Sequence, residues 1–365
     1  MNATHFRLAE ETDNEGILKL AKRCPQEGMI TFFVNRTPRF NTLHRLLDPN
    51  AWHFVACRED QIIGLVGVVH FQATVLGKNR KIGYMLDLRV NEAYRSGTIA
   101  YRLLKTATDH LRNSDVDMVI ANFVTDNKKP LVFTSGRGGL PAAYYLGRNR
   151  ILNLLPVHHM KPDNRFKIDT LRENDIPELI ELYQNYSRNF KIAPIITEDR
   201  FRKYLNTVGG LSRKHFFVAK ENGKIKAVTA LWDEHLYKSY QVLKLTSRIT
   251  IVNGLIKFLS HFIRLPHPIR INEPLRQLSL VFYAHDDCPE AMNSLFRHIN
   301  TSCLESEYTL IMLYTQENDP IFSPLKKFIG VSVHSEMYLF AKDTAVFEKL
   351  REDSSTVLFD LSMIL

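Results

Sequence analysis

The sequence predicts a protein of mixed α/β (α+β) class with two domains of one plan, each a mostly antiparallel central sheet flanked by helices. Three observations support this prediction. The chain has 365 residues, which suits two domains better than one. A β-prone apolar run at 84–90 meets a short turn and then a helix whose apolar residues recur at helical spacing from residue 99. The opening of the chain recurs, because residues 170–176 parallel residues 8–14.

Periodicity and turn signals predict the elements of the first half, residues 1–160. Thr12 and Glu15 have the spacing of a capping box, which marks the start of a helix after a strand near 6–8. The remaining elements follow in this order: a helix at 38–47, strands at 53–57, 62–73 and 81–90, the helix from 99, a strand at 118–124, and a last helix and strand.

The second half, residues 166–345, repeats this plan after a linker near 161–164, and a tail follows at 346–365. Asn222-Gly223 is a strong hairpin signal within 216–231. The other predicted elements are a strand at 166–168, helices at 177–186 and 198–205, a strand at 278–284, a helix at 291–304 and a strand at 309–314. An insertion at 246–276 carries an apolar run at 255–265. We expect a helix packed on its own domain there, rather than a lid over a substrate channel or a face resting on a membrane.

Composition favours a soluble globular protein with an anionic ligand. Hydrophobic residues make up 45% of the chain and charged residues 24%. Residues 1–165 hold 23 basic and 15 acidic side chains, whereas the rest of the chain holds 25 and 24. The basic excess therefore lies in the half with the strand–turn–helix unit. No basic block, zinc-finger spacing or aromatic RNA-binding motif indicates nucleic acid as a partner.

The sequence predicts a cytoplasmic protein without a membrane span. It has no run of 18 uncharged apolar residues, and its first residues lack the pattern of a signal peptide. Its four cysteines have no paired spacing, so we expect free thiols and no metal site. His158-His159 and the other histidines also lack metal spacing and are expected to be surface or core residues. Nothing in the sequence indicates an oligomeric state.

The turn at 91–97 has the features of an anion site. A turn that leads into a helix directs free backbone N–H groups at one point, at the positive end of the helix dipole. Arg95 stands at the mouth of this turn, Ser96 can cap the helix, and Gly97 leaves room for a ligand close to the backbone. These features suit a pyrophosphate, although an ordinary strand-to-helix connection is the competing interpretation.

This segment resembles the central motif, Arg/Gln-x-x-Gly-x-Gly/Ala, of the GNAT superfamily of acyl-CoA-dependent N-acyltransferases. Val90, Arg95, Ile99, Ala100 and the pair Leu103-Leu104 match it in place, but Thr98 stands where the family usually has Gly. The order of elements over 6–160 is also similar to the GNAT fold, and the chain as a whole resembles a tandem GNAT protein. The resemblance implies that acetyl-CoA or another acyl-CoA binds at Leu88, Arg89, Val90, Arg95, Ser96, Gly97, Thr98, Ile99, Ala100 and Asn127.

Asp87 and a pair of tyrosines are the candidate catalytic residues. Asp87 interrupts an apolar strand one step from the expected thioester, so we predict a general base or an anchor for the substrate ammonium. A simple pairing of Asp87 with Arg89 is the alternative. The resemblance implies an acid from a Tyr near the end of the last helix, for which Tyr144 is our choice and Tyr145 the substitute. Arg137, in a Gly-rich run, is a candidate for a substrate carboxylate or a CoA phosphate, or belongs to a plain turn.

The second half has no equivalent of the phosphate loop. Residues 285–290 carry three acids where the first half has Arg95-Ser96-Gly97, so we expect this copy to have lost CoA. The predicted function is therefore an acyl-CoA-dependent N-acyltransferase that acts on a primary amine of a small molecule or peptide, with a degenerate second copy that completes the substrate site. The alternatives are a non-catalytic acyl-CoA sensor or scaffold, and a tandem aminoacyltransferase of the Fem type.

Overall fold

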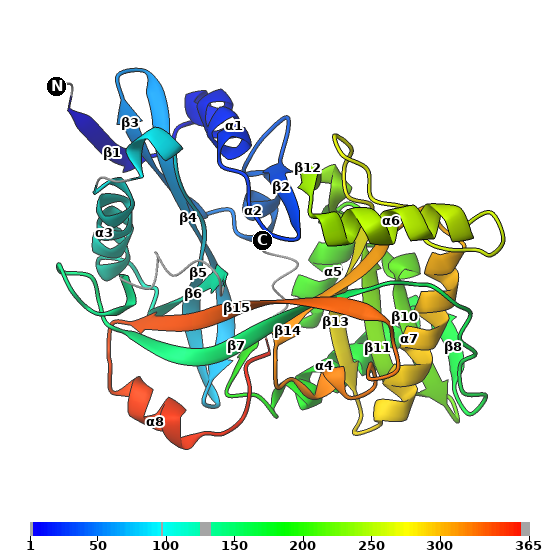
Figure 1. Ribbon diagram of the computed structural model, residues 1–365. Helices are drawn as coiled ribbons and strands as arrows, with labels where there is room; N and C mark the ends of the chain where they lie inside the picture. The colour runs from blue at the N-terminus through cyan, green and yellow to red at the C-terminus, as the bar shows by residue number, and fades with distance from the viewer. Residues whose placement is uncertain (1–2, 96–97, 125–132, 359–365) are drawn as a thin grey trace.

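The computed structural model describes residues 3–95, 98–124 and 133–358 (Figure 1). The strands of the first half are β1 (Thr4–Leu8), β2 (Ile30–Asn35), β3 (Trp52–Arg58), β4 (Gln61–Val75), β5 (Lys78–Val90), β6 (Met118–Val124) and β7 (Ala143–Leu154). Its helices are α1 (Asn14–Arg23), α2 (Thr42–Leu47) and α3 (Ile99–Arg112), with short 3₁₀ turns η1 (Glu11–Asp13) and η2 (Glu92–Tyr94).

The second half repeats this order of elements. Its strands are β8 (Lys167–Thr170), β9 (Ile192–Pro194), β10 (Phe216–Glu221), β11 (Lys224–Trp232), β12 (Ser239–Leu245), β13 (Gln277–His285), β14 (Leu310–Gln316) and β15 (Gly330–Ala341). Its helices are α4 (Ile176–Ser187), α5 (Glu198–Thr207), α6 (Ser247–Leu259), α7 (Pro289–Leu304) and α8 (Val346–Glu352), with 3₁₀ turns η4 (Glu173–Asp175), η5 (Arg213–His215), η6 (Glu234–Leu236) and η7 (Pro320–Phe322). No helix of the described part of the chain is both long and apolar enough to cross a membrane.

The repeated opening of the two halves is confirmed at the level of single hydrogen bonds. Asp13 accepts a bond from the backbone N–H of Glu10 at 2.7 Å, and Asp175 accepts the corresponding bond from Arg172 at 3.0 Å. Each carboxylate closes the turn that precedes a helix, α1 in the first half and α4 in the second. The same local device therefore starts both copies.

One sheet runs through both halves of the molecule. Its strands follow the order β1-β3-β4-β5-β6-β15-β7-β14-β13-β11-β10-β8, and β9 joins it beside β4. The last strand, β15, lies between β6 and β7 and is antiparallel to both, whereas β7 also pairs with β14 of the second half. A separate ribbon joins β2 to β12. Figure 1 shows β15 and β7 crossing the middle of the molecule side by side. The two copies are thus joined by shared strands.

The first-half sheet is covered on both faces. Val55, Ile62 and Leu65 pack with α1, whereas the neighbouring Phe54, Ile63 and Val66 pack with α3. Since successive side chains of a strand point to opposite faces, α1 and α3 lie on opposite sides of the sheet. This arrangement places α3, and the predicted phosphate-binding turn before it, on the opposite side of the sheet from α1.

Three sequence predictions were wrong in detail. The helix expected at 38–47 covers only 42–47, and β2 was not predicted. The tyrosines Tyr144 and Tyr145 lie in β7 and not near the end of a helix. In the described residues before them, Gly136, Gly138 and Gly139 have φ angles of +72°, +67° and +82°, which a right-handed helix does not allow. Finally, α6 does not bury its apolar side chains, since none of its residues is fully buried.

Candidate active site

The centre of the first copy is a bulge in β5. The pairing of β5 with β4 shifts register opposite the segment between Leu86 and Arg89, and Asp87 within that segment has a φ of +54°. On its other side β5 pairs in parallel with β6 only from Ile82 to Met85. Beyond Met85 the two strands diverge, as the family resemblance implied. A diverging pair leaves backbone N–H and C=O groups without strand partners, and these can hold an extended ligand.

The turn predicted to bind phosphate follows the end of β5. The Nε of Arg95 donates to the backbone oxygen of Val90 at 3.1 Å, which folds the arginine over the end of the strand. Helix α3 follows, with Thr98 at its N-cap and no side-chain capping bond. A Cβ added to Gly64 would come within 2.8 Å of Leu103, so the glycine allows α3 to pack closely on β4. Ser96, Gly97 and Asn127 lie outside the described residues.

The first backbone N–H groups of α3 are not used by the hydrogen bonds of the helix itself. Its first intrahelical bond is donated by the N–H of Arg102 to the oxygen of Thr98 at 2.9 Å. The N–H groups of the preceding residues, Ile99 and Ala100 among them, have no acceptor within the helix. Together with the helix dipole and the Arg95 side chain they form a site suited to a phosphate group.

Asp87 is held in a buried ion cluster on the face opposite α3. Arg36 donates to Asp87 at 2.7 Å, and Arg89 approaches it at 3.0 Å, with all three side chains 7% exposed. Burial acts to raise the pKa of Asp87, but the two guanidinium groups outweigh it and hold that pKa well below its usual range. The pairing of Asp87 with Arg89 is therefore confirmed. A carboxylate held so firmly in its ionised form is a weak base, and its base role stays a prediction.

Two histidines lie beside this cluster. The Nδ1 of His44 and the Nε2 of His53 are 2.9 Å apart. Burial lowers the pKa of His53 to about 4, and burial followed by the charge of Arg36 lowers the pKa of His44 well below its usual value. Both rings are thus neutral at pH 7. Within the described residues, the Nε2 of His44 is buried without a hydrogen-bond partner.

The second copy extends the cluster with an ion pair of its own. Lys238 and Glu234 are 3.0 Å apart with side chains 0% and 1% exposed, and Gln277 donates to Glu234 at 2.9 Å. The charge of Lys238 contributes to the lowered pKa of His44, and the charge of Asp87 acts on Lys238. The cluster therefore spans both copies.

A second polar network occupies the point where β5 and β6 diverge. The side-chain amide of Asn122 donates to the hydroxyls of Tyr84 at 3.1 Å and Tyr314 at 3.3 Å. The Tyr314 hydroxyl also bonds Ser335 at 2.8 Å, and Asn149 donates to Asn122 at 3.1 Å. Burial raises the pKa of Tyr314 to about 12, so its hydroxyl stays protonated at neutral pH. These residues come from five strands of the two halves.

The predicted acids Tyr144 and Tyr145 make other contacts. Tyr145 is 47% exposed and donates to Glu336 at 2.5 Å, and burial together with this carboxylate raises its pKa above the usual value. Tyr144 stacks on Phe347 with ring centroids 5.6 Å apart. Neither hydroxyl is hydrogen-bonded to the ion cluster of Asp87. Arg137 is exposed on the Gly-rich turn, which is tied to α3 by a bond from Arg112 to the oxygen of Gly139 at 3.0 Å.

The second copy has the bulge but not the phosphate loop. Phe282 in β13 has a φ of +54°, and β11 shifts register opposite it. The segment after β13 places Asp286, bound to Lys226 at 2.7 Å, and Asp287 before α7. Acidic residues at a helix N-terminus oppose the binding of an anion. The described residues contain no group of His, Cys, Asp and Glu that could hold a metal ion.

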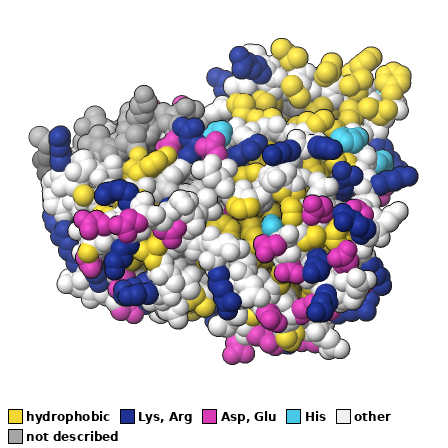
Figure 2. All heavy atoms as spheres, turned by 90° about the horizontal axis from the view of Figure 1, so that it is seen from below, with side chains coloured by type: hydrophobic (Ala, Val, Ile, Leu, Met, Phe, Trp, Pro, Cys, Tyr) yellow, Lys and Arg dark blue, Asp and Glu magenta, His cyan; other side chains and the backbone are white. Residues whose placement is uncertain are grey.

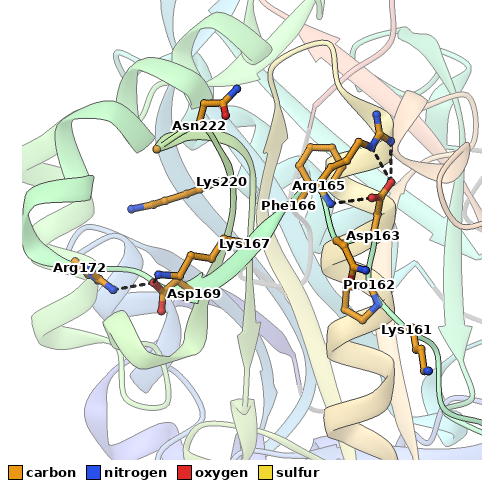
Figure 3. A pocket seen from close by; sticks show the side chains of 12 residues that line it. Lys161, Pro162, Asp163, Arg165, Phe166, Lys167, Asp169, Arg172, Lys220 and Asn222 are labelled. Atoms are coloured by element: carbon orange, nitrogen blue, oxygen red, sulfur yellow. Dashed lines mark hydrogen bonds and ion pairs between the residues drawn. The ribbon is translucent and has the colours of Figure 1, made fainter.

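A pocket of the second copy lies at the other end of the sheet (Figure 3). Figure 3 shows that its acids are already occupied, since Asp163 pairs with Arg165 and Asp169 with Arg172, each at 2.8 Å. Lys220, which also lines it, is 2.6 Å from Asp175 of the turn before α4. These ion pairs are structural, and the pocket is separate from the site at Asp87.

Sequence reasoning singled out the turn at 91–97 and Asp87 but missed most of the buried cluster. Arg36, His44, His53, Glu234 and Lys238 belong to segments that carry no motif. The available signal was a polar or charged residue within an otherwise apolar element, as for His44 in 42–47 and His53 in 52–58. A polar residue within an apolar element does not by itself indicate which other polar residues it contacts in the folded protein.

Comparison with known proteins agrees with the fold. Residues 15–131 match the family model described as Acetyltransferase (GNAT) family. The N-terminal copy is therefore a GNAT acyltransferase domain, which makes the protein an enzyme of the N-acyltransferase class. None of the curated proteins has a significant sequence match to this chain.

Two kinds of solved structure share the architecture of the whole chain. Saccharomyces cerevisiae N-myristoyltransferase with bound myristoyl-CoA aligns with a TM-score of 0.62 at 15% identity, over 93% of this chain and 83% of that one. A conserved protein of unknown function from Enterococcus faecalis, described as a probable N-acyltransferase, aligns with a TM-score of 0.52 at 9% identity, over 94% and 74%. At these identities the likeness concerns the fold. The tandem GNAT fold is thus shown for nearly the full chain.

Proposed function

We propose that the protein transfers an acyl group from acyl-CoA to a primary amine by direct attack, with CoA bound to the N-terminal copy only. One observation carries this proposal: the bulged strand β5 diverges from β6 and leads through Arg95 to the uncapped start of α3. The pyrophosphate would lie on the N–H groups at the start of α3, and the pantetheine along the backbone of Leu88, Arg89 and Val90. Ser96, Gly97, Thr98 and Asn127 complete the expected contacts.

The acceptor amine would meet the thioester on the face of Asp87. The buried cluster there holds three cations (Arg36, Arg89 and Lys238) and two carboxylates (Asp87 and Glu234), while both histidines are neutral. A surplus of positive charge in a buried site lowers the pKa of an entering ammonium and so favours the nucleophilic amine. His44, whose Nε2 is buried without a hydrogen-bond partner in the described part of the chain, is our candidate for orienting the neutral amine by accepting a hydrogen bond from it. Asp87 would hold Arg36 and Arg89 in place.

The acyl group can be short or long. Acetyl-CoA is the donor suggested by the sequence, and the myristoyl-CoA held by the yeast neighbour makes a long-chain donor the natural second probe. The described cysteines are all free, as in a reducing compartment, and we place the enzyme in the cytoplasm. The amine is a small molecule or a peptide.

Calorimetric titration with acetyl-CoA and myristoyl-CoA tests the proposal. We expect one site per chain, and a loss of at least about tenfold in affinity for Arg95→Glu, because the variant places a negative charge beside the pyrophosphate. The matched control is Arg80→Glu at the far end of β5, where Arg80 is 45% exposed and 3.6 Å from Asp117. The control should bind as the wild type does.

Three other results would each change the conclusion. Unchanged binding by Arg95→Glu would exclude the loop as the CoA site. Binding of two molecules per chain would exclude a degenerate second copy. Tight binding without thiol release in the presence of a broad amine panel would favour the acyl-CoA sensor over the enzyme.

A further inference from the structure

Helix α6 and the turn after it present apolar side chains to the solvent. Ile251, Phe258 and Phe262 are 70%, 62% and 74% exposed. Further exposed hydrophobic residues of the same segment are Val252, Leu255, Leu259 and Ile263. Figure 2 shows hydrophobic side chains gathered at one corner of the molecule, on the side where Figure 1 places α6, with Lys or Arg side chains at the edge of the patch. A contiguous patch of this kind on a folded protein marks an interaction surface.

The helix is fixed in place although its apolar face is free. Asn253 donates to the backbone oxygen of Ile269 at 2.7 Å and accepts from its N–H at 3.1 Å. The backbone N–H of Thr246, just before the helix, donates to Met29 of the first copy at 3.1 Å. The inward positions of α6 are therefore used for anchoring. The exposed face points away from the protein, which does not fit a lid closed over an internal channel.

The segment around this face is basic. Residues 246–272 contain four Arg or Lys, two His and no Asp or Glu. Arg264 and Arg270 lie near Glu305 and Glu273 at 3.6 and 3.3 Å, whereas no ion-pair partner of Arg248 or Lys257 is present among the described residues. Exposed aromatic and aliphatic side chains beside unpaired cations are the pattern of helices that lie in the interface of an anionic membrane.

We propose that α6 docks the protein on the surface of an anionic lipid bilayer. The side chains of Ile251, Phe258 and Phe262 would enter the boundary between headgroups and acyl chains, and Arg248 and Lys257 would contact lipid phosphates. A second copy of this chain is a poorer occupant, because two acid-free segments would face each other and their cations would repel. This inference is independent of the chemistry at Asp87.

Vesicle sedimentation tests the docking surface. We expect the protein to sediment with vesicles of phosphatidylcholine and phosphatidylglycerol, and less with phosphatidylcholine alone. Phe258→Asp/Phe262→Asp should lower the partition coefficient at least about tenfold, because charges replace the inserted rings. The matched control is Leu236→Asp/Ile329→Asp, at positions 69% and 52% exposed outside α6, which should sediment as the wild type does.

A fluorescent variant tests insertion directly. Trp232 is fully buried and Trp52 partly so, and neither lies in α6. Phe258→Trp therefore adds a reporter whose emission should shift to the blue when anionic vesicles are added. Failure of the wild type to sediment with anionic vesicles, or equal sedimentation of Phe258→Asp/Phe262→Asp, would overturn the proposal. A wild-type dimer that becomes monomeric in that variant, without vesicle binding by either, would identify a second copy as the occupant instead.

Discussion

The two copies place different side chains at the bend of corresponding strands, β5 in the first copy and β13 in the second. Asp87 of the first copy and Phe282 of the second both have a φ of +54° and both lie at a register shift. Asp87 is surrounded by arginines, whereas Phe282 packs on Phe201 and Phe216 with centroids 5.7 and 5.6 Å apart. The bend is thus a property of the fold, whereas a charged side chain at the bend is found in the first copy and an aromatic one in the second. A retained bend without polar groups marks a site that has become core.

Of the substitutions that test this comparison, we expect one at Asp87 to have the largest effect on the free energy of unfolding. Asp87→Asn leaves Arg36 and Arg89 buried without a counter-charge, and should lower the free energy of unfolding by about 3 kcal/mol or more. Phe282→Leu in the second copy keeps the site apolar and should cost about 1 kcal/mol. Urea unfolding of both variants measures the difference. Adding Arg36→Met to Asp87→Asn should recover part of the loss, and equal losses for the two single variants would contradict the assigned difference.

The pH dependence of stability should differ in sign between a histidine of each copy. The pKa of His53 is lowered to about 4 by burial, so the unfolded chain binds its proton first and stability falls as the pH drops below 6.5. From pH 6.5 to pH 5 this amounts to about 1.5 kcal/mol. The pKa of His235 is raised, chiefly by its bond to Asp233 at 2.6 Å, so its contribution is present below 6.5 and is lost as the pH rises through the raised value.

Urea unfolding at pH 5, 6.5 and 8 measures both contributions. His53→Gln should reduce the loss of stability at acid pH, the remainder coming partly from His44, and His235→Gln should flatten the alkaline side by well under 1 kcal/mol, because that pair is partly exposed. If both variants kept the wild-type dependence of the unfolding free energy on pH, the two histidines would be excluded as its source.

The repeated turns should respond alike. Asp13→Ala and Asp175→Ala each remove the carboxylate that accepts a backbone N–H before a helix, and each should lower stability by about 1 kcal/mol. The double variant should show the sum, since the sites lie in different copies. Asp286→Ala, at an exposed ion pair before α7, is the control and should have almost no effect. A marked difference in stability between Asp13→Ala and Asp175→Ala would show that the two repeated turns do not contribute equally to the free energy of unfolding.

The smallest effect is expected at Thr98. Thr98→Gly restores the residue usual in the GNAT motif and removes a Cβ near the expected pyrophosphate. We expect acyl-CoA to bind several-fold more tightly, by about 1 kcal/mol or less, in the calorimetric assay used for Arg95→Glu. Weaker binding would mean that the side chain of Thr98 contacts the ligand.

Local patterns were sufficient to predict most of the fold. The hairpin at Asn222-Gly223, the helix from 99 and the paired openings at Asp13 and Asp175 all follow from signals within a few residues. The position of β15 between β6 and β7 of the first half has no such signal. The alternation of polar and apolar residues within a strand does not determine which strands it pairs with. The same holds for the site. Asp87 is visible as a charge within an apolar strand, but its ion pair with Arg36 and its electrostatic interaction with Lys238 depend on the pairing of β2 with β12.

The position of β15 also has a consequence for biosynthesis. The first copy closes its sheet with residues 330–341, so a nascent chain that has completed residues 1–160 still exposes the edges of β6 and β7. Unpaired edges of this kind invite pairing with other chains. The first copy therefore reaches its final form only after residues 330–341 have left the ribosome, and a fragment that stops before residue 330 should need a chaperone to remain dispersed.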